Sequence, residues 1–145
     1  MSTILLQLGT AFVGSLGFAL LFHTRKDFWI PASLGGMLSW GIYLLGKAHL
    51  YGVFFPCLIA SAFAALYAEV LARILKAPAT IFFITAVVPL IPGSTLYYTM
   101  SYAVRGAWDT SRTYGLLTIQ YALSIASGIS LMWAFSMMVT KILKR

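Results

Sequence analysis

Charged residues are scarce in this sequence: only 9% of its 145 residues are Asp, Glu, Lys or Arg, and three of them are acidic. The composition is 61% hydrophobic, which is far from that of an average soluble domain. The chain also has a single cysteine, Cys57, so an intramolecular disulfide and a thiolate metal cluster are excluded. We expect Cys57 to be a small apolar residue of the core.

The motifs of common enzyme chemistries are absent as well. The sequence contains no HExxH, no GxSxG, no P-loop and no cluster of Cys and His. His23 and His49 are isolated in predicted turns and form no ligand set. We therefore predict that the chain is not an enzyme and that it uses no metal and no cofactor.

The basic residues lie at the ends of apolar runs. The net charge is +7, yet no basic face forms, which argues against nucleic acid as a partner. Such a distribution is typical of topology signals beside a lipid bilayer. One side collects seven cations against three on the other, so we predict an outside N-terminus and a cytoplasmic C-terminus. The seven are Arg25, Lys26, Arg73, Lys76, Lys141, Lys144 and Arg145, and the three are Lys47, Arg105 and Arg112.

Five uncharged runs are long enough to cross a bilayer, and short turns separate them. The sequence therefore predicts an all-α integral membrane protein with a single transmembrane domain over residues 1–145. The expected helices cover residues 3–22, 29–46, 50–75, 79–104 and 114–140. Small residues repeat every four positions on the first three helices, which predicts close helix contacts within the chain, between copies or with a partner.

The fourth run contains the sequence PLIPG at residues 89–93. A straight helix over Ala77 to Val104 would be about 42 Å long, beyond a ~30 Å hydrocarbon core. Pro89 and Pro92 each remove a backbone donor, and Gly93 accepts backbone angles that other residues avoid. We predict that the fourth span is broken here, as in transporters that form a substrate site near the bilayer midplane. An ordinary proline kink in a tilted helix is the alternative.

A break at PLIPG would expose the N-terminus of the second half-helix. The first amides there, near Ser94 and Thr95, lack intrahelical acceptors and carry partial positive charge, which suits a carboxylate. The two hydroxyls either orient that carboxylate or merely cap the helix, and Gln120 of the fifth helix either completes a polar wall or helps the helices pack. The predicted substrate path comprises Pro89, Pro92, Gly93, Ser94, Thr95, Tyr97, Tyr98 and Gln120.

Glu69, Arg73 and Lys76 form a second candidate group at the end of the third span. A carboxylate within a membrane span is a candidate proton carrier or gate. Glu69 and Arg73 are also four residues apart with the acid first, the spacing of a structural ion pair on a helix. Lys76 falls near the helix C-terminus, where the helix dipole favours a cation. The gating and structural interpretations both stay open.

Three stretches carry a family resemblance. They are GFALLF with the charged turn after it (Gly17 to Lys26), SLGGMLSWGIYLL (Ser33 to Leu45) and ALYAEVLARILKAPATIFFITAVVPLIPGSTLYY (Ala65 to Tyr98). In this order they resemble the membrane domain of the threonine/serine exporter (ThrE) family, in particular its small-subunit, YjjB-like form. The resemblance covers approximately Leu8 to Val139, which is nearly the whole chain.

This resemblance implies an exporter of the bacterial inner membrane, driven by an ion gradient. The implied substrates are threonine and serine, or succinate-like dicarboxylates for the split form. The resemblance also implies a larger YjjP-like membrane subunit as partner, and hence a hetero-oligomer, with Pro89, Pro92, Gly93 and Tyr97 on the translocation path. Two hypotheses follow: the broken helix of this chain binds the substrate carboxylate, or the chain scaffolds a complex in which the partner binds substrate.

Overall fold

A computed structural model describes residues 2–143 of the chain. Within these residues the protein is all-helical and has no strand, so the predicted all-α fold is confirmed. The helices are α1 (Ser2–Leu21), α2 (Trp29–His49), α3 (Phe54–Leu75), α4 (Ala79–Val87), α5 (Gly93–Val104) and α6 (Trp108–Leu143). Two short 3-10 helices, η1 (Lys26–Phe28) and η2 (Val88–Leu90), precede α2 and follow α4.

Four described segments are long and apolar enough to cross a membrane, and a bent pair of helices adds a fifth if it forms one span. The four are Thr3–Leu21, Lys26–His49, Phe54–Leu75 and Trp108–Val139, and the bent pair is Ala79–Leu90 with Gly93–Val104. This set matches the predicted bundle of about five transmembrane helices.

Four helix ends differ from the prediction by three residues or more: α2 ends at residue 49 and not 46, α3 begins at 54 and not 50, and α6 begins at 108 and not 114 and ends at 143 and not 140. Before α3, Gly52 has a φ of +80°, a backbone conformation that glycine adopts readily in a turn. Lys47 lies in the last turn of α2 and Asp109 in the first turn of α6. Both charges interact favourably with the helix dipole, so these charged segments belong to helices and not to loops.

Small residues mediate the contacts among α1, α2 and α4. Gly36 of α2 lies so close to α1 that a β-carbon there would overlap the Oγ atom of Ser15. Ser15 Oγ in turn donates a 3.0 Å hydrogen bond to the carbonyl oxygen of Thr85 on α4. The small residues predicted to mediate helix contacts therefore join helices of this chain. Cys57 is fully buried, as expected of a core residue.

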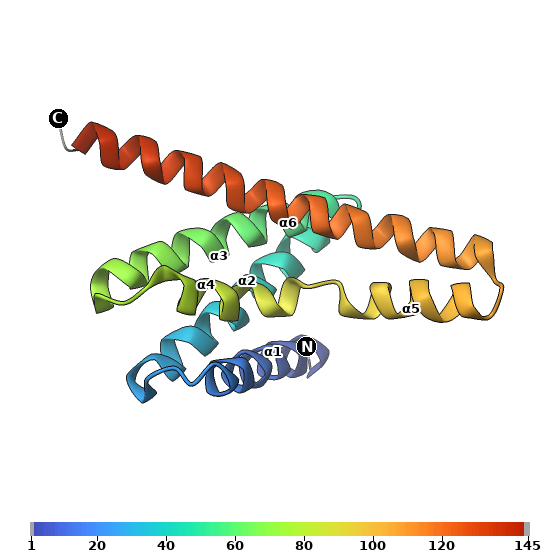
Figure 1. The fold of residues 1–145 in the computed structure, drawn as a ribbon, viewed down its shortest axis with the longest axis horizontal. Coiled ribbons are helices and arrows are strands. Elements are labelled where there is room, and N and C mark those ends of the chain that lie inside the picture. Colours follow the sequence, from blue (N-terminus) through green and yellow to red (C-terminus); the bar gives the residue numbers. More distant parts are fainter. Residues whose placement is uncertain (1, 144–145) are drawn as a thin grey trace.

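Helix α6 is much longer than the others. Its 36 residues correspond to about 54 Å at 1.5 Å per residue, against about 33 Å for the 22 residues of α3. The later part of α6 packs on α3, where Ser61 lies against Gly128, while its first part packs on α5. Figure 1 shows the result: α5 and the start of α6 form a hairpin that projects away from the bundle of α1–α4.

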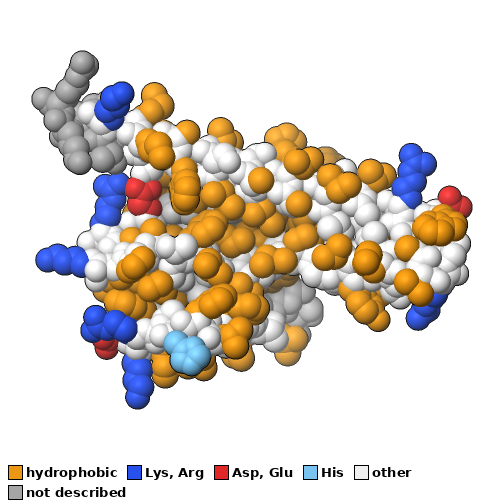
Figure 2. Space-filling model, viewed as in Figure 1, with side chains coloured by type: hydrophobic (Ala, Val, Ile, Leu, Met, Phe, Trp, Pro, Cys, Tyr) orange, Lys and Arg blue, Asp and Glu red, His pale blue; other side chains and the backbone are white. Residues whose placement is uncertain are grey.

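The charged side chains visible in Figure 2 gather at the two ends of the molecule, and apolar side chains cover the surface between them. This is the surface expected of a protein with a lipid bilayer around its middle. Of the three basic residues counted in the C-terminal tail, Lys141 is described and exposed, whereas Lys144 and Arg145 lie outside the described residues.

Candidate functional site

The chain bends by 52° where the pair α4–η2 meets α5. Residues Ile91 and Pro92 are non-helical, so the interruption falls within the predicted PLIPG sequence. Pro89 lies in η2, and Pro92 is the residue that precedes the first turn of α5. Neither proline has an N–H to donate, which explains why the α-helical hydrogen bonding stops here. In a membrane, a bend of this kind forms either a broken span or a re-entrant loop.

The N-terminus of α5 is open. The Gly93 amide donates to the Ile91 carbonyl oxygen at 2.8 Å, and the Leu96 amide donates to the Pro92 carbonyl oxygen at 3.1 Å. Among the described residues, the amides of Ser94 and Thr95 donate to no other backbone group. Gly93 and Ser94 are exposed, and no atom lies within 4 Å of the position that a β-carbon on Gly93 would occupy. The first turn of α5 therefore offers two amides and a partial positive charge to a ligand.

Thr118 and Tyr114 of α6 hold α5 in place, and neither residue is among those predicted from the sequence. Thr118 Oγ1 donates a 3.0 Å hydrogen bond to Thr95 Oγ1. The ring of Tyr114 packs on Tyr98, with centroids 5.2 Å apart. Tyr97, by contrast, is 66% exposed, and its ring lies edge-on to that of Tyr98 with centroids 5.5 Å apart. Their spacing of four on the inner face of α6 is a signal that could have identified Tyr114 and Thr118.

Gln120 does not join this group. It is exposed on α6, and within residues 2–143 no hydrogen bond connects it to the first turn of α5. The structure therefore brings together Ser94, Thr95 and Tyr98 beside the two prolines, and it leaves Gln120 apart.

The break lies nearer one end of the bundle than its middle. Leu90 of η2 is buried in one cluster with Tyr43 of α2 and Cys57 of α3. Tyr43 is six residues from the end of α2, and Cys57 is three residues from the start of α3. At 1.5 Å per residue, both lie within about 9 Å of those helix ends. The non-helical segment therefore lies near the end of the α1–α4 bundle opposite the α3–α4 turn, and not halfway along the bundle.

A cavity of about 230 Å³ adjoins the other side of the break. It is lined by Gln7, Thr10 and Ala11 of α1, Trp40 of α2 and Pro89 of η2. The Oε1 atom of Gln7 is buried and, in the part of the chain that the structure describes, accepts no hydrogen bond. Gln7 is not among the residues predicted from the sequence, although an amide side chain inside an otherwise apolar span is a signal that could have identified it.

The predicted ion pair of α3 is present. Arg73 Nη2 lies 2.5 Å from Glu69 Oε1, and the same carboxylate oxygen accepts a hydrogen bond from Ser136 of α6. Glu69 and Ser136 both line two neighbouring cavities between α3 and α6, of about 370 and 170 Å³. Lys76 is not part of this group: it ends α3 in a left-handed conformation with a φ of +50°.

A family model described as Threonine/Serine exporter, ThrE, matches residues 7–135, which include the break, Gln7 and Glu69. The chain belongs to the threonine/serine exporter family. Together with its apolar helices, this membership makes the protein a multi-pass membrane protein with a transport function and not an enzymatic one. Comparisons with curated proteins and with solved structures gave no match.

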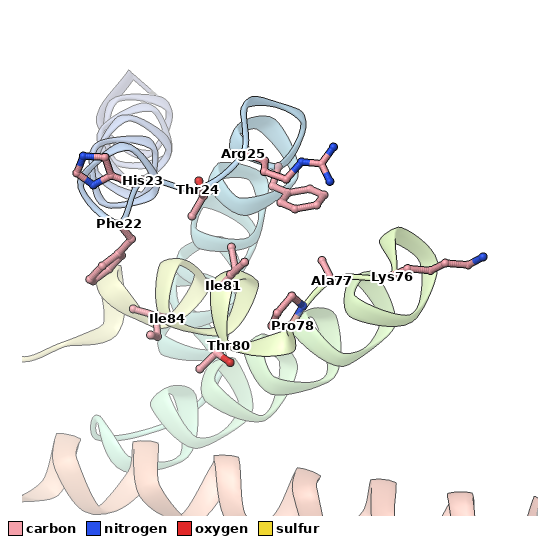
Figure 3. A pocket seen from close by; sticks show the side chains of 11 residues that line it. Phe22, His23, Thr24, Arg25, Lys76, Ala77, Pro78, Thr80, Ile81 and Ile84 are labelled. Atoms are coloured by element: carbon pink, nitrogen blue, oxygen red, sulfur yellow. The ribbon is translucent and has the colours of Figure 1, made fainter.

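The exporter has a further cavity of about 430 Å³ at the end of the bundle where the α1–α2 and α3–α4 turns meet. Figure 3 shows Arg25 and Lys76 extending to the same side of this cavity, with His23 on the other side. Arg25 pairs with Asp27 at 3.1 Å and remains largely exposed. Ile81 and Ile84 of α4 contribute apolar lining. The exporter therefore has a basic rim around an apolar cavity at the end opposite the PLIPG break.

Proposed function

We propose that this exporter chain is the membrane subunit of a secondary transporter for small carboxylate metabolites, namely threonine and serine or succinate-like dicarboxylates. In this proposal α4, η2 and α5 form one broken span, and the first turn of α5 binds the substrate carboxylate. The observation that carries the proposal is the open N-terminus of α5, where the amides of Ser94 and Thr95 donate to no backbone group. Amides in that position bind anions well, because the helix dipole adds positive potential.

The charge distribution supports an export direction. If the end with Arg25, Lys76 and Lys141 faces the cytoplasm of a bacterium, as the positive-inside rule predicts, the N-terminus of the chain lies outside. The basic rim of the cavity in Figure 3 then attracts anionic substrate on the cytoplasmic side of the inner membrane. The resemblance to the exporter family implies an ion gradient as the energy source.

The hairpin of α5 and α6 supports a larger partner subunit. None of the residues of α5 is buried, and α6 is the helix against which α5 packs. Leu96, Met100 and Val104 are large apolar side chains of α5 that stay exposed. A partner helix laid along this hairpin would bury them. We propose that a YjjP-like membrane subunit does so, in a hetero-oligomer that contains one or more copies of this chain.

The same exposed hairpin favours a second function, in which this chain scaffolds a complex and the partner alone binds substrate. Counterflow in lipid vesicles tests whether the complex transports these compounds at all, which both functions require. Vesicles that contain both subunits are loaded with unlabelled threonine, serine or succinate, and uptake of the labelled compound is measured. We expect counterflow with both subunits and none with empty vesicles. An assembled complex that exchanges none of the three compounds would contradict the proposed function.

A further inference from the structure

We propose that the cavity where the α1–α2 and α3–α4 turns meet binds an anionic phospholipid, with the phosphate at the basic rim and part of one acyl chain in the apolar interior. We name it the turn cavity. The lipid would act as a structural ligand that joins the α1–α2 turn to the start of α4. This assignment goes beyond the proposed function and does not depend on it, because it requires only that the chain lies in a membrane.

Two cations from separate turns line the cavity. Arg25 belongs to the α1–α2 turn and Lys76 ends α3, and both are exposed. The guanidinium carbon of Arg25 lies 5.4 Å from the centroid of the Phe28 ring, and Nη2 lies 3.1 Å from Asp27. The side chain of Arg25 is still 75% exposed, so this surface pair leaves other N–H donors of the guanidinium available. A phosphate at the rim can therefore meet positive charge from both turns.

The backbone holds both turns in defined conformations. The carbonyl oxygen of Thr24 accepts a 3.0 Å hydrogen bond from Trp29 Nε1, which secures the α1–α2 turn. Lys76 has a φ of +50°, and after it the Ala77 amide donates to the Ala72 carbonyl oxygen at 3.1 Å. This is the hydrogen bonding of a well-formed helix C-terminus. The two cations are thus presented by ordered turns, which lowers the entropy cost of binding an anion between them.

The opposite side of the cavity is apolar and continues onto the exposed surface of the spans. Phe22, Ile81 and Ile84 line it, and Phe22 and Ile84 are exposed. Figure 3 shows Phe22 and Ile84 on the side away from Arg25 and Lys76. Since α1 and α4 both belong to candidate spans, the cavity lies where those spans reach the interface. A ligand that fits needs an anionic part beside an apolar part, and a free phosphate or a small dicarboxylate has only the first.

The size of the cavity and the start of α4 fit such a ligand. Its volume of about 430 Å³ is within the range of about 300–1,000 Å³ that is usual for ligand pockets. Pro78 and Thr80 also line it, and among the described residues the amides of Ala79 and Thr80 donate to no other backbone group. The positive end of the α4 dipole therefore adds to the two cations. Basic pockets between transmembrane helices are typical sites for anionic headgroups.

Bound lipid would leave this end of the molecule positively charged. Lys26 and Lys141 are exposed and do not line the turn cavity. Their charges stay available to attract an anionic substrate, so the lipid site is compatible with the proposed role of this end in transport.

Equilibrium binding to the purified full-length chain in a neutral detergent tests the assignment with three labelled probes. Phosphatidylglycerol has an anionic headgroup and acyl chains, phosphatidylcholine has the chains without net charge, and glycerol 3-phosphate has the phosphate without chains. We expect phosphatidylglycerol to bind most tightly. Arg25→Gln and Lys76→Asn should each lower its affinity about fivefold, the contribution of one basic residue near an anionic surface. Asparagine is used at position 76 because it tolerates a positive φ.

Lys26→Gln is the matched control, because it removes a positive charge from the same turn at a residue that does not line the cavity. Its affinity for phosphatidylglycerol should equal that of the unmodified chain. Thermal unfolding without lipid checks that each variant is folded. The assignment is overturned if Lys26→Gln weakens binding as much as Lys76→Asn does, or if phosphatidylcholine binds as tightly as phosphatidylglycerol. Equally tight binding of glycerol 3-phosphate would also overturn it, since the cavity would then be a site for free anions.

Discussion

Thr118 of α6 donates a 3.0 Å hydrogen bond to the hydroxyl of Thr95, and Thr95 Oγ1 lies 3.1 Å from the carbonyl oxygen of Pro92, to which it donates. These two bonds connect the first part of α6, through the first turn of α5, to the proline at the break. The orientation of the open amides on α5 therefore depends on a residue that is 26 positions away from Pro92 in the sequence.

Thr118→Val tests this connection, because valine has the shape of threonine without the hydroxyl. We expect the free energy of unfolding to fall by about 0.5–1.5 kcal/mol, the usual contribution of one hydrogen bond. Thr113→Val is the matched control, since among the described residues the Thr113 hydroxyl bonds only to the Asp109 carbonyl oxygen, on the exposed side of the same helix. Thermal unfolding in detergent measures both. Equal effects of the two substitutions would mean that the Thr118–Thr95 bond does not secure α5.

Glycines at the helix contacts should tolerate no β-carbon. At Gly128 it would overlap Ser61 Oγ and lie 2.5 Å from the carbonyl oxygen of Leu58, which is backbone and moves little. We expect Gly128→Ala to destabilise the protein by about 1–3 kcal/mol, as overpacking does. Gly17→Ala in α1 has no atom within 4 Å and should stabilise by up to about 1 kcal/mol, because alanine favours the helix. If Gly128→Ala and Gly17→Ala shifted the melting temperature in the same direction, the close contact of Gly128 with α3 would be contradicted.

Much of the fold is predictable from the sequence, because apolar runs and turns are local features. The interruption at PLIPG is one of them: two prolines remove donors whatever surrounds them. The limits of the helices are less predictable, since the charge of Asp109 suits both a loop and a helix N-terminus. The contacts of the site are the least predictable. Gln7 and Pro89 line one cavity although 82 residues separate them, and nothing local to either residue indicates that proximity.

The sequence admits two interpretations of Glu69, as a proton carrier and as a member of a structural ion pair. Its carboxylate contacts Arg73 on the same helix and Ser136 on α6, so it connects α3 to α6. We expect Glu69→Gln to keep full export activity, because the glutamine amide oxygen still accepts from Ser136, and to lose no more than about 1 kcal/mol of stability. Efflux of labelled threonine measures the first point. Loss of efflux from a normally assembled Glu69→Gln complex would identify Glu69 as a proton carrier instead.

Tyr43 and Tyr121 join α2 to α6 beside η2, with their hydroxyl oxygens 2.6 Å apart. Tyr43 is 3% exposed, so Tyr121→Phe would leave its hydroxyl buried without this partner. We expect a loss of about 1–3 kcal/mol in the free energy of unfolding. Tyr97→Phe, on the exposed side of α5, should change stability little. Denaturant titration compares the two variants, and an unaltered midpoint for Tyr121→Phe would show that this bond does not stabilise the bundle.

The measurement that tests the account most directly is substrate efflux by Gly93→Leu. No atom lies within 4 Å of the position of a β-carbon on Gly93, and the φ of Gly93 is not positive, so we expect the fold to accept the leucine side chain and this side chain to cover the first amides of α5. Gly9→Leu, at an equally open position on α1, is the control. We predict that the Gly93→Leu complex assembles in normal amounts and exports less than about a tenth as much labelled threonine as the Gly9→Leu complex, the loss expected from one charge-assisted contact. Normal export by an assembled Gly93→Leu complex would contradict a substrate site at the N-terminus of α5.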